Sequence, residues 1–302
     1  MSTSAEPPDT GRRPIRPKIE GLALVLITAC SWGFAWPVTK FLLTELPPFT
    51  MRSVCSAAGV AFAFAVATLR REALWPPPGQ WGLLLVYSML NFGIFMVFTT
   101  LALVLLPASE AVIVTYTLPI WTAALAWPVL GERPTLLRVT AIALGVAGVA
   151  LLVGVGSAEP SQSRLPGVLA GGLAAALFGL GAVIAKRAPL AMPLVAGVAW
   201  QVMLGIVPLL VPALWERPNW TMVTPLGWLA IAYVAIVPMT VAYLAWFRAL
   251  RLVSAATAST ALLIAPVAGV FSSSLLLGEA LGARQLVALA LTLTGVALAA
   301  RE

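Results

Sequence analysis

Apolar runs of about twenty residues follow one another along almost the whole chain, separated by short polar or proline-containing links. Continuous runs of this length are typical of transmembrane helices, because about twenty helical residues cross the hydrocarbon core of a bilayer. Membrane strands are not expected, because the runs do not alternate between apolar and polar residues. We expect ten helices, at residues 22–43, 48–69, 82–103, 108–130, 136–155, 167–186, 190–213, 226–246, 255–277 and 283–300.

The first twenty residues differ from the rest, being polar, proline-containing and basic. The apolar run behind them is too long for a signal peptide and lacks a small-residue cleavage site before the next run. We therefore interpret residues 1–20 as a disordered basic cytoplasmic tail before a retained first helix. Residues 21–156 and 166–300 then form two units of five helices each.

The two units repeat each other at an offset of about 147 residues. Four features recur: Trp32-Gly33 as Phe178-Gly179, Lys40 as Lys186, Pro119 with Gly131-Glu132 as Pro266 with Gly278-Glu279, and Gly148-Val149-Ala150-Leu151 as Gly295-Val296-Ala297-Leu298. Because each repeat holds an odd number of spans, the second must cross the membrane in the opposite sense. The expected fold is an all-α integral membrane protein with ten transmembrane helices in a 5+5 inverted-topology repeat, typical of carriers that alternate access about a central site.

Composition and charge agree with a membrane-embedded chain. It is 61% hydrophobic and 10% charged, with a mean hydropathy of +0.99, far more apolar than a soluble domain needs. With the N-terminus inside, 13 of the 18 basic residues lie at cytoplasmic helix ends and 5 at outer ends. This bias predicts that both termini are cytoplasmic. The net charge of +7 is then a topology signal, and we expect no nucleic-acid partner.

The residue inventory disfavours enzymatic chemistry. The chain has no histidine, its one aspartate is Asp9 in the tail, and no phosphate-binding Gly-x4-Gly-Lys-Ser/Thr loop is present. We therefore expect no enzyme, no metal site and no cofactor. A proton relay also lacks acids near the membrane centre, with Glu110 near the outer end of the fourth span as the remaining candidate. Facilitated diffusion or exchange is the simpler expectation.

The repeated motifs carry a family resemblance over residues 20–300. The chain resembles the drug/metabolite transporter superfamily, in its ten-helix EamA-type branch of small-metabolite exporters. The resemblance rests on Trp32-Gly33 with Lys40, on Arg52 early in the second helix, and on the paired Pro and Gly-Glu motifs. It departs at Ala35, near which the family often has Asn. The aromatic content is similar to that of exporters of aromatic and other neutral amino acids, and the family implies a bacterial inner membrane.

Candidate substrate-binding residues are polar or aromatic positions near span centres, where inverted-repeat carriers bind their solutes. Asn91 is the sharpest of them, because an amide in hydrocarbon must find a partner or face water. The candidates are Trp32, Trp36, Tyr87, Asn91, Thr115, Tyr116, Phe178, Tyr233, Thr240, Tyr243, Thr257 and Thr260. The alternatives for single residues are helix packing, or Ser and Thr bonding to their own helix.

Candidate gating residues lie at helix ends and at kinks. Pro119 and Pro266 occupy equivalent positions and could kink paired helices, and Pro119 leaves the Thr115 carbonyl without its helical N–H. Lys40 and Arg52 could hold the outer end shut through Glu45 or backbone carbonyls, or simply extend toward water.

An aromatic site with few fixed charges suits a net-neutral solute with an apolar side chain. The expected function is export of small neutral metabolites, foremost amino acids with aromatic or large apolar side chains, by alternating access. The alternative is an exporter of aromatic drugs or quaternary amine cations bound by cation–π attraction, either with or without proton coupling. A channel stays open as a third class, which saturable counterflow would separate from a carrier. The expected partners are a small-molecule substrate and the lipid bilayer, with the protein a monomer or homodimer.

Overall fold

A computed structural model describes residues 15–131, 135–153, 164–253, 258 and 261–299. The described residues form helices and no strand. Seven of the helices are long and apolar enough to cross a membrane, and three shorter apolar helices accompany them, at Leu136–Leu152, Ile264–Leu277 and Ala283–Ala299. Together they match the number of spans expected from the sequence.

The first repeat runs from α1 to α7. Its elements are α1 (Ile15–Leu42), α2 (Pro48–Leu69), a third span made of α3 (Trp81–Tyr87), the π-helix η1 (Ser88–Gly93) and α4 (Ile94–Leu105), a fourth span made of α5 (Ala108–Thr115) and α6 (Leu118–Leu130), and α7 (Leu136–Val153).

The second repeat runs from α8 to α15. Its elements are α8 (Leu165–Arg187), a seventh span made of α9 (Leu194–Gly205) and α10 (Val207–Ala213), the 3-10 turn η3 (Trp220–Met222), an eighth span made of α11 (Pro225–Ile236), the π-helix η4 (Val237–Val241) and α12 (Ala242–Leu252), then α14 (Ile264–Leu277) and α15 (Ala283–Ala299).

Three helix starts differ from the sequence prediction by four residues or more, and the eighth span ends at Leu252 and not at 246. Helix α1 begins at Ile15, so the tail before it is shorter than the twenty residues expected. The seventh span begins at Leu194 and not at 190, because Pro193 occupies its N-cap position with extended backbone. In the ninth span, expected at 255–277, α14 begins at Ile264, and positions 255–257 and 259–260 lie outside the described residues.

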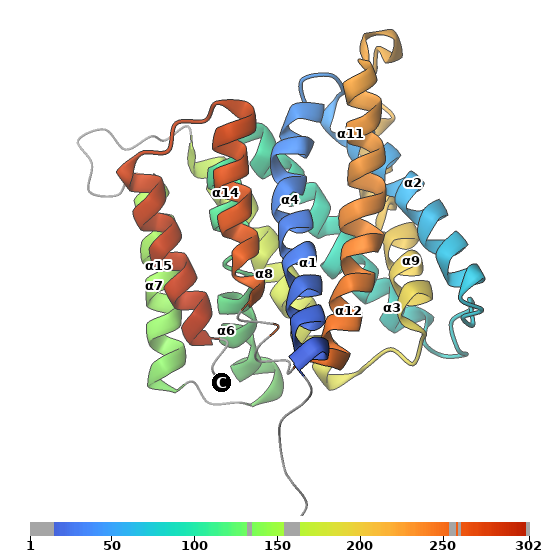
Figure 1. The fold of residues 1–302 in the computed structure, drawn as a ribbon, viewed down its shortest axis with the longest axis horizontal. Coiled ribbons are helices and arrows are strands. Elements are labelled where there is room, and N and C mark those ends of the chain that lie inside the picture. The colour runs from blue at the N-terminus through green and yellow to red at the C-terminus, as the bar shows by residue number, and fades with distance from the viewer. Residues whose placement is uncertain (1–14, 132–134, 154–163, 254–257, 259–260, 300–302) are drawn as a thin grey trace, which may run out of the picture.

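The repeated Gly-Val-Ala-Leu motif is the crossing point of α7 and α15. A Cβ at Gly148 would lie 2.7 Å from Thr292 Oγ1 and 2.9 Å from the Ala288 carbonyl oxygen. A Cβ at Gly295 would lie 2.7 Å from the Ala141 carbonyl oxygen. Each repeat thus supplies a glycine that lets the other repeat's helix approach closely. The pair lies side by side at one edge of the bundle, opposite α2, α3 and α9 (Figure 1).

Gly33 and Gly179 make a second pair of equivalent crossings, nearer the centre. A Cβ at Gly33 on α1 would lie 2.6 Å from the Ala265 carbonyl oxygen on α14. A Cβ at Gly179 on α8 would lie 2.9 Å from the backbone nitrogen of Thr122 on α6. The first helix of each repeat therefore packs at its glycine against the fourth helix of the other repeat.

The third and eighth spans each contain a π-helical segment, which the sequence did not predict. The segments η1 and η4 begin 149 residues apart, within two residues of the repeat offset. A π-helical turn widens the helix and re-aims its side chains, and such turns are frequent at functional sites. In this chain they place Asn91 and Thr240 on equivalent spans.

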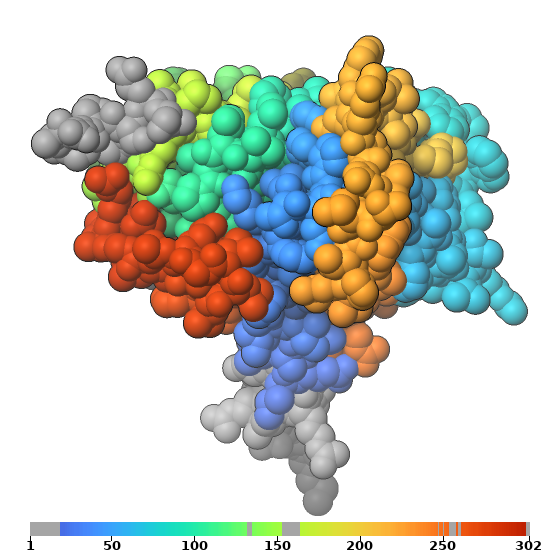
Figure 2. Space-filling model, turned by 90° about the horizontal axis from the view of Figure 1, so that it is seen from above, coloured from blue at the N-terminus to red at the C-terminus, as the bar shows by residue number. Residues whose placement is uncertain are grey.

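The two ends of the bundle are named here by equivalent lysines. The end at which α1 stops, close to Lys40, Glu45 and Glu279, is called the Lys40 end, and the opposite one the Lys186 end. Figure 2 views the Lys40 end, where α1 (blue) lies between the green segment around α5 and the orange α11.

Candidate substrate site between the two repeats

Trp32 on α1 connects the first repeat to the π-helical segment of the second. Its indole Nε1 donates to the backbone carbonyl oxygen of Pro238 in η4 at 2.9 Å. Its ring meets Tyr243 edge-on, with centroids 5.3 Å apart, and lies 6.4 Å from Trp246. The bond therefore attaches a side chain of α1 to the backbone of an irregular helical segment in the other repeat.

Trp36 lies one turn further along α1 and faces the break in the fourth span. Its ring centroid is 6.4 Å from that of Tyr116. Tyr116 and Thr117 separate α5 from α6, and Pro119 lies in the first turn of α6. Thr115, at the last position of α5, is 1% exposed, and its Oγ1 has no hydrogen-bond partner. The site residues of this span therefore lie at an interrupted helix.

The ninth span is interrupted at the equivalent place. Leu263, 147 residues after Tyr116, is a turn residue outside the helix, and Pro266 follows in the first turns of α14. The two prolines thus follow equivalent helix breaks. Of the candidates on this span, Thr257 and Thr260 lie outside the described residues.

Asn91 and Thr240 carry unpaired oxygens in the two π-helical segments. Asn91 Oδ1 and Thr240 Oγ1 are buried atoms without a hydrogen-bond partner. Asn91 Oδ1 lies flush against α8, since a Cβ at Gly181 would be 1.8 Å from it. Thr240 borders a small cavity between α2, α9 and the eighth span, lined by Ala63, Leu194, Val195, Val198, Met239, Thr240, Tyr243 and Leu244. A solute donor group would satisfy either oxygen.

The other aromatic candidates divide into two kinds. Phe178 on α8 packs against Phe95 on α4, with centroids 5.1 Å apart. The hydroxyls of Tyr87 and Tyr233 are instead engaged with backbone: Tyr87 donates to the Ala188 carbonyl, and Tyr233 donates to the Ser31 carbonyl at 3.1 Å. Tyr87 is also 3% exposed. These two tyrosines tie helices together through their polar ends.

Lys40 and Arg52 both make contacts inside the bundle. Lys40 Nζ donates to the carbonyl oxygen of Leu103, in the last turn of α4, and at 2.8 Å to that of Leu106, which directly follows α4. Arg52 Nε donates to Thr100 Oγ1 at 3.0 Å. Glu45, the alternative partner considered for both, accepts instead from the backbone nitrogen and the hydroxyl of Thr224.

Glu110, the one candidate for proton coupling, lies in a polar cluster at the Lys40 end. Its Oε1 accepts from Arg164 at 2.7 Å and from Gln285 Nε2 at 3.0 Å, while its buried Oε2 has no partner. The carboxylate is 1% exposed. Its charge is therefore compensated within the protein, at the helix end and away from the aromatic residues of α1.

Carboxylates that bind helix N-termini across the repeats were missed by the sequence reasoning. Glu216 accepts from the backbone nitrogens of Phe49 and Thr50 at the start of α2, and Glu72 accepts from that of Ala196 at the start of α9. Glu279 does the same at the start of α5. A carboxylate suits a helix N-terminus, where free N–H groups and the helix dipole favour negative charge. The sequence signal that could have revealed them is the spacing of Glu72 and Glu216, which is close to the repeat offset.

Two matches to the model of the EamA-like transporter family cover residues 19–154 and 165–301, one for each repeat. The chain belongs to the EamA-like transporter family. This EamA-like chain is therefore a multi-pass membrane transporter, and the expected ten-helix repeat fold is confirmed.

Individual relatives agree with the family. The chain is 26% identical to the uncharacterized transporter YvbV of Bacillus subtilis (strain 168) over 293 residues, covering 93% of this chain and 92% of YvbV. It is 23% identical to YoaV of the same organism over 260 residues, covering 85% and 88%. An uncharacterized transporter of Archaeoglobus fulgidus is 25% identical over 289 residues, covering 92% and 98%. A solved crystal structure shares the fold at a TM-score of 0.64 and 22% identity, covering 95% of this chain and 97% of that one.

Proposed function

We propose that this transporter exports small neutral metabolites, foremost amino acids with aromatic or large apolar side chains, across a bacterial inner membrane by alternating access. The observation that carries the proposal is the chemistry around α1, where Trp32 meets Tyr243 of the other repeat and Trp36 meets Tyr116. Two buried hydroxyl oxygens without a partner accompany these rings: that of Thr240, which lines one cavity with Tyr243, and that of Thr115, next to Tyr116 in the chain. A zwitterionic amino acid offers an ammonium donor for such oxygens and an apolar side chain for the rings.

The absence of free charge at this level supports a neutral solute. Among the described residues of the spans, Lys40, Arg52 and Glu110 each have partners within the protein. A phosphorylated substrate would need a free basic cluster at depth. A zwitterionic solute needs no such cluster, because its positive and negative groups cancel and it carries no net charge.

The charged residues also bear on the orientation of the protein in the membrane and on the energy source of transport. With both termini cytoplasmic, as the basic residues predict, the Lys40 end faces outward. Because the candidate acid Glu110 is paired with Arg164, we propose facilitated diffusion or exchange and not obligatory proton coupling.

A thermal-shift panel tests the substrate class, because a ligand that binds the folded protein raises its melting temperature by mass action. The purified transporter would be heated with phenylalanine, tryptophan, leucine, glutamate, and the aromatic cation tetraphenylphosphonium. Concentration-dependent stabilisation by the first three and not by glutamate would support the proposal. Stabilisation by tetraphenylphosphonium alone would favour the second candidate, an aromatic-cation exporter, for which the Trp32 and Tyr243 rings supply cation–π surfaces.

A further inference from the structure

At the Lys40 end, two charged side chains, Lys40 and Glu279, form hydrogen bonds to the short link between the third and fourth spans. On one side, Lys40 of α1 donates to the Leu103 and Leu106 carbonyls at the end of α4. On the other, Glu279, after α14, accepts from the Ala108 nitrogen at 2.6 Å, the Ser109 nitrogen at 2.9 Å and the Ser109 hydroxyl at 2.6 Å. Lys40 and Glu279 also interact electrostatically.

Each charge matches the helix end that it contacts. A helix C-terminus presents unpaired carbonyls and partial negative charge, which favour the lysine, and an N-terminus presents unpaired N–H groups, which favour the carboxylate. Helix α5 has no side-chain cap from its own N-cap residue, Pro107, so Glu279 of the other repeat supplies it. Ala108 and Ser109 are at most 1% exposed, which strengthens these charge-assisted bonds.

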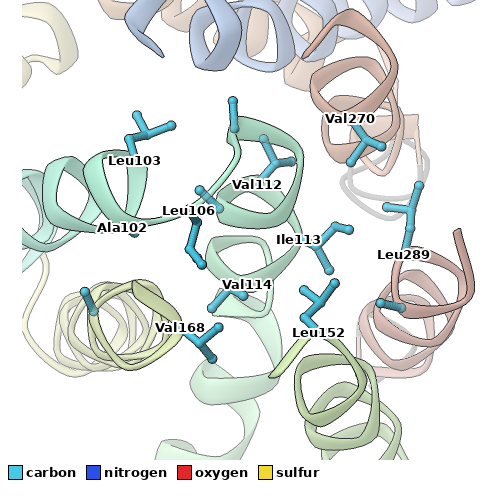
Figure 3. Packing of buried hydrophobic residues seen from close by; sticks show 14 residues of the cluster. Ala102, Leu103, Leu106, Val112, Ile113, Val114, Leu152, Val168, Val270 and Leu289 are labelled. Atoms are coloured by element: carbon cyan, nitrogen blue, oxygen red, sulfur yellow. The ribbon is translucent and has the colours of Figure 1, made fainter. Parts of the chain in front are cut away.

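Behind this contact lies a fully buried segment of the interface between the repeats. All eight residues of α5 are buried, whereas α6, the continuation of the same span toward the Lys186 end, buries only Ile120 and Ala126. Leu103, Leu106, Val112 and Val270 belong to one apolar cluster with residues of α7, α8 and α15 (Figure 3).

The cluster lies between the contact and the aromatic candidates. Trp36 and Tyr116 pack against it as partly buried residues. Val112 of the first repeat packs closely against α14 of the second, since a Cβ on Gly269 would lie 3.0 Å from its side chain. The path from the aromatic residues to the Lys40 end is therefore filled by side chains from both repeats.

We infer that Glu279 and Lys40 together form a latch, meaning a set of hydrogen bonds that holds the Lys40 end of the transporter closed. Glu279 is the part of the latch that connects the two repeats, because it binds α5 of the first repeat from the second. Opening this end separates Glu279 from the start of α5 and lets the apolar cluster part. The inference rests on the alternating-access part of the proposed function and is independent of the substrate. Glu216 provides the matched comparison, because it caps α2 with the same geometry but at the edge of the bundle, away from the cluster.

The test measures access to the cluster by thiol modification. Cys30 and Cys55 are replaced by alanine, Val112→Cys is added as reporter, and the protein in lipid nanodiscs reacts with 2-sulfonatoethyl methanethiosulfonate. Glu279→Gln should raise the modification rate about tenfold or more, because bonds to a charged acceptor are lost. Glu216→Gln should leave the rate within about twofold of the parent, because Glu216 caps α2 away from the cluster that contains position 112.

A second reporter, Ala126→Cys on α6, separates opening of one end from general loosening. Its rate should not rise in Glu279→Gln. An unchanged rate at position 112, an equal rise in Glu216→Gln, or an equal rise at position 126 would each overturn the latch. Should Glu279→Gln not fold, Ser109→Ala removes one of the three bonds and should give a smaller rise, and no rise would equally overturn it. No substrate is needed, so failure of the amino-acid proposal would leave this result standing.

Discussion

Trp32 and Pro238 are joined by a hydrogen bond between an indole N–H of the first repeat and a backbone carbonyl of the second. The bond lies where α1 meets a π-helical turn, beside the ring of Tyr243. One side chain therefore contributes both to holding the irregular turn and to the aromatic surface proposed for the solute.

Replacing Trp32 by phenylalanine keeps an aromatic ring and removes the donor. Because one neutral hydrogen bond contributes about 0.5–1.5 kcal/mol, we expect transport efficiency to fall about twofold to tenfold. The measurement is the concentration dependence of exchange in proteoliposomes. Trp127→Phe is the control, because Trp127 is 56% exposed on α6. Equal behaviour of the two variants would contradict a role for the Trp32–Pro238 bond.

Gly181→Ala should disturb Asn91, because the new Cβ would lie 1.8 Å from Asn91 Oδ1. We expect a loss of stability of about 1–3 kcal/mol from overpacking, measured as a lower melting temperature, together with weaker transport. Gly172→Ala on the same helix is the control, since nothing lies within 4 Å of its new Cβ.

The double variant Gly181→Ala/Asn91→Ala separates packing from solute binding at the same place. Removing the amide makes room for the new methyl group, so the melting temperature should recover. Transport should stay low if Asn91 binds the solute. Full recovery of both would show that Asn91 only packs.

Gly148→Ala and Gly295→Ala should destabilise the protein to a similar extent, because each new methyl group would collide with the opposite scaffold helix. The expected loss is about 1–3 kcal/mol for each, with little effect on the substrate affinity of the folded fraction. Thermal unfolding checks the first part and ligand-induced stabilisation the second. A large loss from one variant and none from the other would contradict the equivalence of these crossings.

Glu110→Gln tests whether the polar cluster couples transport to protons. The variant removes the carboxylate charge that Arg164 and Gln285 contact, so we expect lower thermal stability. We expect exchange at equal pH on both sides to persist, and the response to a pH gradient to be as small as in the parent. A parent response to the gradient that disappears in the variant would instead assign proton coupling to Glu110.

The parts of the fold that depend on repeated residues were predictable from the sequence. Gly148 and Gly295 recur because each lets the opposite helix approach, so their contact is encoded in residue type as well as position. Pro119 indicated an interrupted helix because a proline cannot bond to the carbonyl four residues before it.

The parts that depend on partners distant in the chain were not predictable. The π-helical turn at 88–93 contains no proline and has no single-residue signature. Pro238 indicates an irregularity in the turn at 237–241 but does not specify its π-helical geometry. In the sequence Glu279 is part of a Gly-Glu loop motif, and nothing there shows that it caps α5, whose Ser109 lies 170 residues earlier in the chain. Tyr87 and Tyr233 are polar aromatic residues within spans, which made them site candidates, but their hydroxyls bond to the backbone carbonyls of Ala188 and Ser31.

The most direct test of the central claim is uptake of labelled phenylalanine into liposomes that contain the purified protein, with and without unlabelled phenylalanine inside. The account predicts saturable uptake that preloading accelerates and that an imposed pH gradient leaves unchanged. Uptake that does not saturate and is indifferent to preloading, or accumulation driven by the pH gradient alone, would contradict it.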